Sequence, residues 1–586
     1  MMEFPEYQIM DEIRVAPPIR AQVVVIGAGI AGTWTGLKLA RAGIDTLLID
    51  YAAADRGGVL GSTARSVGAV NTAPMDRPDF REFMDELGQG QVHPSTVDLL
   101  IKYLPEELEE LQGFGEFKRI KLGVALANGN AGGLLRKLQA QFCASGGRIL
   151  DAWVTRLVAD ETSCQGVQYQ QGDTLGKVCA QAVVLACGGY AGLFDGSVKT
   201  NNFGTMLGRF LQSGGLATNM EFIFKHGYGK PDLGALTPTE ELPGAEVYDD
   251  SRDHVEWLER ELYEGRGTAN HLEAFRHWRN NKDRDFFIDL KYRDLYAQVQ
   301  ALNAAYCGRG AGAGPASVEE SLSALLAMCP QAKRHDLEDK VRGWIQAGER
   351  IDFERFGTLK PFFASLAGGE VFRVRQIAYF SMGGAAHVDC ETNLTNVFVT
   401  GEAMHDFGAH RVGGLPWGLY LAAGRLICAR IVERLGAAAG APRAEDFDLL
   451  RVHSRFDPAL LQEIRKKMHS HQERDLNIVD ATKFISWIRA RRRELLQARR
   501  TLDDAVAWTI VAEGVMQASL RRAESRGCFY RSDHPVSLQQ MKTRFSCVNY
   551  NAQADVVPAA RLIRIAELPG VLLESPVPTQ LRAAVG

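Results

Sequence analysis

The chain has 586 residues, of which 46% are hydrophobic and 24% are charged, and its formal net charge at pH 7 is -4. One hydrophobic core does not extend over such a length, so we expect roughly two to four domains. The composition is that of an ordinary globular protein, and the charge balance gives no indication of nucleic-acid binding.

The ten cysteines include no Cys-x-x-Cys pair. This argues against a zinc or iron–sulfur site within the chain and against a disulfide framework, and it favours a reducing compartment. The acidic N-terminus has no apolar signal-peptide core, and we find no run that requires a membrane. We therefore expect a cytoplasmic protein with no membrane partner. The basic stretch 489–493, with Arg499 and Arg500, is interpreted as a solvated helical face. The isolated pair His469 and His471 is not expected to bind a metal.

The stretch 21–50, AQVVVIGAGIAGTWTGLKLARAGIDTLLID, predicts a strand, a tight turn, a helix and a second strand. Gly27 permits the turn, Gly29 lets a pyrophosphate approach the backbone, and Gly32 allows close packing of helix and strand. The free N–H groups at the start of the helix face the phosphates. Asp50, about twenty residues further on, can accept hydrogen bonds from an adenosine ribose. The pattern predicts a bound dinucleotide.

The segments that follow predict an α/β protein. Residues 57–74 are rich in small side chains and predict a loop beside the cofactor. Helices are expected over 79–112 and 133–142, and strands over 148–154, 166–169 and 178–182. The apolar run 182–186 reads as a buried strand that leads into Cys187-Gly188-Gly189, a second close approach of the backbone to the cofactor.

The second half of the chain changes character twice. Residues 220–370 are charged and aromatic and are expected to be helical, with a flexible loop at 306–317. A strand over 396–400 then leads through Gly401 and Glu402 into a long amphipathic helix. After a small-residue linker at 436–442, residues 443–540 are expected to be helical, and the tail after Met541 to consist of short strands and loops.

These residues together resemble the flavoproteins of succinate dehydrogenase, fumarate reductase and L-aspartate oxidase. The resemblance runs from about residue 20 to 540 and rests on nine motifs in the family's order: GAGIAG, GSTARSVGAVN, LACGG, MEFIFKH, SRDHVEWLERELYEGRG, SMGG, GEA, GAHRVGG and ESRGCFYR. It implies an α/β fold with a Rossmann-like FAD-binding domain (20–220 and 371–436), an inserted capping domain that closes over the substrate (221–370), a C-terminal helical domain (443–540) and a C-terminal extension (541–586).

The resemblance implies FAD as the dinucleotide. The residues expected to bind it are Gly27, Ala28, Gly29, Gly32, Asp50, Ser62, Thr63, Gly68, Ala186, Gly188, Gly401, Glu402, Pro416 and Trp417. Members with a covalent flavin carry a histidine where this chain has Ser62, and serine cannot form that link. We therefore expect FAD to be noncovalently bound.

In the family, a hydride passes between a substrate carbon and flavin N5, and an arginine moves a proton. Arg252 corresponds to that arginine, with Asp253 as a candidate to orient it. Arg411 in GAHRVGG corresponds to an arginine that binds a substrate carboxylate with two parallel hydrogen bonds. His226 corresponds to a histidine that contacts the second carboxylate.

The chain also departs from the family. A substrate-binding histidine is replaced by Tyr379, the Pro-Thr after His226 by Gly227-Tyr228, and Asn-Ser-Leu by 415–417, Leu-Pro-Trp. Small polar groups are thereby replaced by aromatic ones. The resemblance therefore implies an oxidoreductase for a carboxylated small metabolite other than succinate, fumarate or aspartate.

Two other functions stay open. The first is an electron-transferring subunit that passes electrons to a separate iron–sulfur protein, and the second is a flavin-binding structural protein without catalysis. The first predicts co-purification with a cysteine-rich chain. The second predicts that changing Arg252 to alanine leaves the activity in cells intact.

Overall fold

The structure is a computed structural model with two compact units, residues 1–224 with 379–586, and Lys225–Ala378. It describes residues 14–51, 69–72, 75, 78–120, 123–126, 131–160, 162–195, 197, 202–225, 228–230, 235–236, 247–249, 286–288, 302, 315–327, 334–346, 372–376, 379–404, 407–409, 414–437, 447–450, 452, 457–473, 476–551 and 553–574. All statements below concern these residues.

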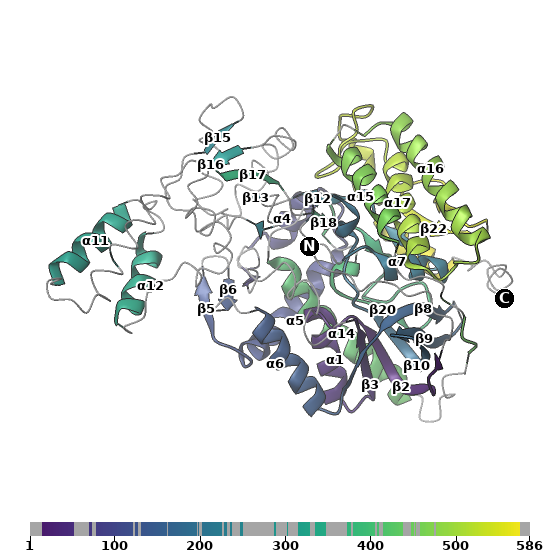
Figure 1. Cartoon of the computed structure of the whole chain (residues 1–586), viewed down its shortest axis with the longest axis horizontal. Coiled ribbons are helices and arrows are strands. Elements are labelled where there is room, and N and C mark those ends of the chain that lie inside the picture. The colour runs from purple at the N-terminus through teal and green to yellow at the C-terminus, as the bar shows by residue number, and fades with distance from the viewer. Residues whose placement is uncertain are drawn as a thin grey trace. The chain divides into compact units, whose positions relative to one another are not determined.

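The first unit is built on an eight-stranded sheet with the strand order β7-β3-β2-β10-β9-β8, in which β1 and β20 also pair with β10 (Figure 1). Its strands are β1 (Arg14–Val15), β2 (Ile19–Ile26), β3 (Thr46–Asp50), β7 (Arg148–Asp151), β8 (Trp153–Ala159), β9 (Cys164–Gln171), β10 (Thr174–Leu185) and β20 (Val397–Val399). The pairs β2–β3, β3–β7, β2–β10 and β10–β20 are parallel, so these strands end at the same edge of the sheet. In open sheets of this type, ligands bind at that edge, where the strand order reverses.

Helix α1 (Ile30–Arg41) connects β2 to β3 and packs against α6 (Ala131–Ala144) and α14 (Leu415–Ala437), while α14 packs against α5 (Pro94–Gln112). A buried ion pair joins α1 to α5, because Lys38 Nζ lies 2.9 Å from Glu107 Oε1. Helix α14 is long and apolar enough to cross a membrane by length and composition alone, but 67% of its apolar window is buried inside the structure. Its apolar side chains are therefore accounted for by packing.

The expected helix over 79–112 is two helices, α4 (Phe80–Leu87) and α5. Between them the chain turns through Gln89 and Gly90, which both have positive φ. The expected strand 178–182 and residues 182–185 of the expected strand 182–186 are parts of one strand, β10. A three-stranded sheet, β4 (Ala69–Asn71), β6 (Gly123–Leu126) and β5 (Phe117–Ile120), and α7 (Thr205–Gln212) complete this part of the unit.

Helices α15 (Pro458–Glu473), α16 (Ile478–Gln497) and α17 (Asp504–Arg521) pack together in the region drawn in green in Figure 1. The interpretation of 489–493 as a solvated face is wrong for Arg489 and Arg492. Arg492 is fully buried and pairs with Glu513 on α17, and Arg489 Nε lies 2.6 Å from the same carboxylate. These charges hold two helices together.

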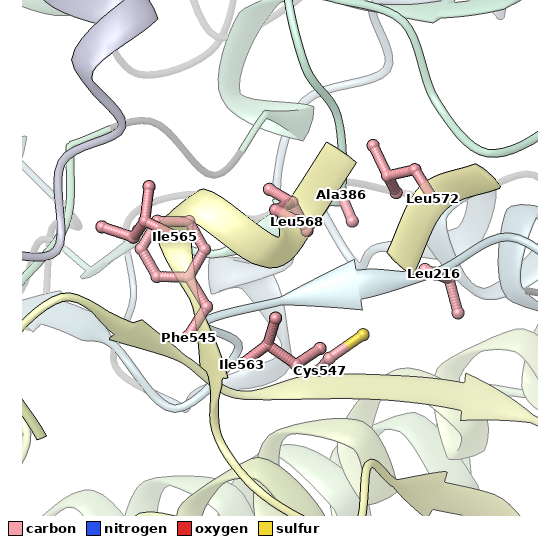
Figure 2. Close-up of a cluster of buried hydrophobic side chains, with 8 residues drawn as sticks. All are labelled: Leu216, Ala386, Phe545, Cys547, Ile563, Ile565, Leu568 and Leu572. Carbon is pink, nitrogen blue, oxygen red and sulfur yellow. The ribbon is translucent and has the colours of Figure 1, made fainter. Parts of the chain in front are cut away.

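The tail contains β21 (Arg544–Phe545), β22 (Cys547–Tyr550), β23 (Val556–Pro558) and β24 (Ile563–Arg564), as expected, and also a helix, α18 (Leu568–Glu574). Strands β22 and β23 join β11 (Ala217–Thr218) and β19 (Gly384–Ala385) in a four-stranded sheet. Figure 2 shows the cluster that anchors the tail, in which Leu568 and Leu572 of α18 face Leu216 and Ala386. The tail therefore packs on segments that belong to the first unit.

The second unit contains a five-stranded sheet with the order β14-β13-β17-β16-β15. The strands are β13 (Tyr228–Lys230), β14 (Ala235–Leu236), β15 (Val247–Asp249), β16 (Phe286–Ile288) and β17 (Phe372–Gln376), and the helices are α11 (Pro315–Ala327) and α12 (Arg334–Gln346). The expectation of a helical segment over 220–370 is therefore wrong for β13, β14, β15 and β16. Residues 315–317 of the expected loop belong to α11.

Candidate functional site

The turn after β2 leaves no room for a side chain. Gly27 has φ +109°, and a Cβ on it would lie 2.3 Å from the carbonyl oxygen of Ala186, at the end of β10. A Cβ on Gly32 would lie 1.9 Å from the Gly27 carbonyl oxygen. Gly29 caps α1 without any side-chain hydrogen bond, and the first turn of α1 contains no acidic residue. Its N–H groups and the positive end of the helix dipole therefore suit an anionic group such as a diphosphate.

Asp50 lies at the end of β3, beside this turn. Its Oδ2 accepts a hydrogen bond of 2.7 Å from the backbone N–H of Ala28. Burial raises the pKa of the Asp50 carboxyl to about 6, although the hydrogen bond from Ala28 partly offsets the shift. A carboxylate beside the phosphate turn is what recognition of an adenosine ribose requires.

The turn after β2 forms one wall of the candidate site, and the end of β10 forms a second wall. Gly188 has φ +75°, and its Cβ would lie 3.0 Å from Nδ2 of Asn202. Asn202 is 8% exposed, and its Nδ2 has no hydrogen-bond partner among the residues that the structure describes. Burial raises the pKa of the Cys187 thiol to about 12, so this thiol is not a nucleophile at neutral pH. A buried amide donor without a partner is costly, and a bound polar ligand would satisfy it.

The third wall follows β20, where the chain turns through the short helix η7 (Gly401–Ala403). Gly401 has φ +75° and approaches α1, since its Cβ would lie 3.1 Å from Cβ of Ala31. The carboxylate of Glu402 accepts a hydrogen bond of 3.3 Å from Oγ of Ser381, the last residue of β18 (Tyr379–Ser381). The segments after β2, β10, β18 and β20 thus converge in one region.

A buried charge network underlies this region. Arg522 has no exposed surface, and its guanidinium donates to Glu221 Oε1 at 2.5 Å, Glu524 Oε1 at 3.1 Å and Gln91 Oε1 at 3.2 Å. It also lies 4.7 Å from the ring centroid of Phe222. Glu221 lies in MEFIFKH and Glu524 in ESRGCFYR, and neither was expected to be a site residue. For Glu221, an acid inside the apolar run Met220–Phe224 was the signal that could have found it.

The structure describes only some of the other residues that were expected at the site. Pro416 and Trp417 lie in the first turn of α14, and Trp417 is 7% exposed. Tyr379 begins β18. Ser62, Thr63, Gly68, His226, Arg252, Asp253 and Arg411 lie outside the described residues. Of the four residues expected to act in catalysis, the structure therefore describes only Tyr379, and of that residue only the backbone.

The described walls fit FAD. The glycine turn suits its diphosphate, Asp50 suits its adenosine ribose, and Asn202 offers an unsatisfied donor beside Gly188. Among the described residues, no group of three or more His, Cys, Asp and Glu side chains is placed to hold a metal ion.

Comparison with known proteins agrees with this geometry. Residues 22–228 match a protein family described as an FAD binding domain. A segment of 236 residues is 28% identical to L-aspartate oxidase of Streptomyces coelicolor, and it covers 36% of this chain and 40% of that protein. The match thus spans less than half the length of that relative.

The fold is similar to those of solved flavoproteins. Quinol fumarate reductase of E. coli is 17% identical, with a TM-score of 0.63 over 94% of this chain and 97% of the other. The Sdh1 complex of Mycobacterium smegmatis is 18% identical, with a TM-score of 0.60 over 97% and 98%. Adenylylsulfate reductase of Archaeoglobus fulgidus is 13% identical, with a TM-score of 0.63 over 96% and 99%. Residues 22–228 therefore match an FAD-binding domain, and the chain has a fold similar to those of quinol fumarate reductase and the Sdh1 complex.

Proposed function

We propose that the protein is an FAD-dependent oxidoreductase that moves a hydride between the flavin and a carbon of a carboxylated small metabolite. The observation that carries the proposal is the convergence of Gly27, Gly188 and Glu402 at the carboxyl edge of one parallel sheet. That edge is where a dinucleotide binds in this architecture. Bound FAD supplies the ring that accepts or donates the hydride.

The protein residues then have separate tasks. The N–H groups at the start of α1 bind the diphosphate, and Asp50 fixes the adenosine end. Arg411 is proposed to bind a substrate carboxylate and Arg252 to move the proton, on the strength of the GAHRVGG and SRDHVEWLERELYEGRG motifs. Orientation of the reacting carbon beside the flavin is the main contribution that such residues make to the rate.

The substrate is proposed to differ from succinate, fumarate and aspartate. Tyr379 stands where the family has a histidine, and Leu-Pro-Trp at 415–417 stands where it has Asn-Ser-Leu. Aromatic and apolar side chains in place of polar ones favour a ligand that offers apolar surface beside its carboxylate. Because Ser62 replaces the histidine of the covalent members, FAD is proposed to be noncovalent.

The test is an anaerobic screen of the purified protein loaded with FAD. Carboxylated compounds are added one at a time, and the absorbance of oxidised flavin at about 450 nm is followed. The proposal expects a small set of compounds to bleach this band, and succinate and aspartate to leave it unchanged. A protein that binds FAD but is reduced by no compound, while dithionite reduces it, would instead favour a structural role. Reduction that is fast while reoxidation requires a copurified iron–sulfur protein would favour the electron-transferring subunit.

A further inference from the structure

We infer that Ser381 is a positioning residue for the flavin site, which acts by holding the carboxylate of Glu402. The inference rests on the proposed function, because it takes Glu402 as a residue that contacts the flavin nucleotide. Ser381 is 3% exposed and lies at the end of β18. Its position places a hydroxyl between two walls of the site.

The hydroxyl of Ser381 both accepts and donates a hydrogen bond. Its Oγ accepts a hydrogen bond of 3.3 Å from the backbone N–H of Tyr190 and donates one of 3.3 Å to Oε1 of Glu402. Tyr190 follows the Gly188-Gly189 turn after β10, and Glu402 follows β20. One side chain therefore connects the two turns that face the ligand region.

The fit around this hydroxyl is tight. A Cβ on Gly189 would lie 1.8 Å from Ser381 Oγ and 3.0 Å from Cγ of Glu402. Residue 189 therefore has to be glycine for Ser381 and Glu402 to meet. This explains the second glycine of LACGG by a contact within the protein, independently of any approach to the cofactor.

The backbone on either side of Ser381 is fixed as well. The N–H of Met382 donates to the Phe222 carbonyl at 2.9 Å, and a Cβ on Gly383 would lie 2.1 Å from the Asn219 carbonyl oxygen. The hydroxyl of Tyr190 donates to the Met220 carbonyl at 3.0 Å. Because these contacts hold the backbone beside Ser381, its hydroxyl is positioned to restrict the Glu402 carboxylate.

A hydrogen bond to a charged group contributes more than a neutral one, and its loss leaves the Glu402 carboxylate less firmly held in position. In the Ser381→Ala variant, we expect the dissociation constant of FAD to rise about 5- to 30-fold. We also expect the midpoint potential of the bound flavin to fall, because the negative charge of the carboxylate is less well compensated without the Ser381 hydroxyl and disfavours added negative charge nearby.

The experiment compares three variants of the full chain by FAD titration and by redox titration of the bound flavin. Ser381→Ala removes the hydroxyl, and Ser381→Cys keeps the shape with a weak donor and should lie between Ala and the native protein. Ser519→Ala is the matched control, since Ser519 is 2% exposed and donates to the Val515 carbonyl at 2.7 Å within α17. The control should bind FAD with native affinity and native potential.

A double-mutant cycle with Glu402→Ala tests the route of action. If Ser381 acts through Glu402, Ser381→Ala has little further effect on FAD affinity in the Glu402→Ala background. Equal effects in both backgrounds, or native affinity and potential in Ser381→Ala, would overturn the inference. These outcomes leave the proposed function intact, whereas a native protein that takes up no FAD overturns both. If Ser381→Ala fails to fold, the affinity and potential of Ser381→Cys decide the matter.

Discussion

Ala28 and Asp50 are joined by a hydrogen bond of 2.7 Å, from the backbone N–H of one to the carboxylate of the other, although 22 residues separate them in the chain. The bond connects the glycine turn after β2 to the end of β3. It holds the carboxylate beside the turn before any ligand binds, and it opposes the effect of burial, which raises the pKa of Asp50 to about 6. Phosphate recognition and ribose recognition are therefore coupled by one contact.

This pKa makes FAD affinity dependent on pH. Ribose hydroxyls donate to the ionised carboxylate, so binding favours the deprotonated form of Asp50. Above about pH 7 the carboxyl is already ionised and the dissociation constant of FAD should be flat; as pH falls through 6, the dissociation constant should rise. The measurement is fluorescence titration of FAD between pH 5 and 8. Asp50→Asn should bind about 10-fold or more weakly at pH 7.5 and lose this pH dependence.

The same pKa shift predicts the sign of a stability effect in the FAD-free protein. Between the ordinary carboxyl pKa of 3.8 and about 6, the folded state holds more protons at Asp50 than the unfolded state does. The contribution of Asp50 to the free energy of unfolding therefore decreases as pH rises through this window, and is constant above it. Urea denaturation of the native protein and of the Asp50→Asn variant at pH 4.5 and 7 measures this contribution of Asp50 to the free energy of unfolding. A stability difference that does not change with pH would contradict the assigned pKa.

Gly27→Ala should abolish FAD binding. The substitution forces a Cβ to 2.3 Å from the Ala186 carbonyl oxygen and places a side chain at φ +109°. Gly43→Ala is the matched control, because Gly43 has φ +79° but nothing lies within 4 Å of its Cβ position. The control carries only the cost of the left-handed backbone, about 1–2 kcal/mol, and should keep FAD. Equal FAD content in the two purified variants would argue against the turn as the phosphate site.

How much of the structure could be predicted from the sequence depends on how far apart along the chain the contacting residues lie. The strand-turn-helix-strand unit was predictable because its glycines, its apolar runs and Asp50 lie within one short stretch. Ser381 and Tyr190 are separated by 191 residues, and Arg522 and Gln91 by 431, and no local pattern connects such pairs. The strands of the second unit were missed because stretches such as Phe286–Ile288 are too short for an alternating pattern to show.

A buried contact from a distant helix also made one interpretation of the local sequence wrong. The run 489–493 has the composition of an exposed face, yet Arg492 is buried because Glu513 of α17 supplies its counter-charge. The roles predicted for Arg252, His226 and Arg411 stay predictions, since these residues lie outside the described part of the chain.

Arg522→Met should strongly destabilise the fold. The change leaves the buried carboxylate of Glu221 without its partner at 2.5 Å, and loss of one member of a buried ion pair costs about 3–5 kcal/mol. Arg148→Met is the control: its ion pair with Asp45, at 2.7 Å, has side chains 45% and 48% exposed. We expect the control to cost less than about 1 kcal/mol in urea denaturation. If both variants lose the same free energy, the buried network does not stabilise the unit.

Arg411→Lys should separate substrate binding from flavin binding. The segment just before Arg411 is held on two sides, since the N–H of Ala409 donates to the Gly88 carbonyl at 3.1 Å and its carbonyl accepts from the N–H of Cys528 at 3.0 Å. A lysine keeps the charge but cannot form two parallel hydrogen bonds to a carboxylate. For a reducing substrate found in the anaerobic screen, we expect KM to rise about 10- to 100-fold while the FAD content stays native.

Arg425→Lys, on the partly exposed side of α14 at 49% exposure, provides the matched control and should keep the native KM. A native KM in Arg411→Lys would mean that another cation binds the carboxylate, and loss of FAD in that variant would mean that Arg411 supports the cofactor instead.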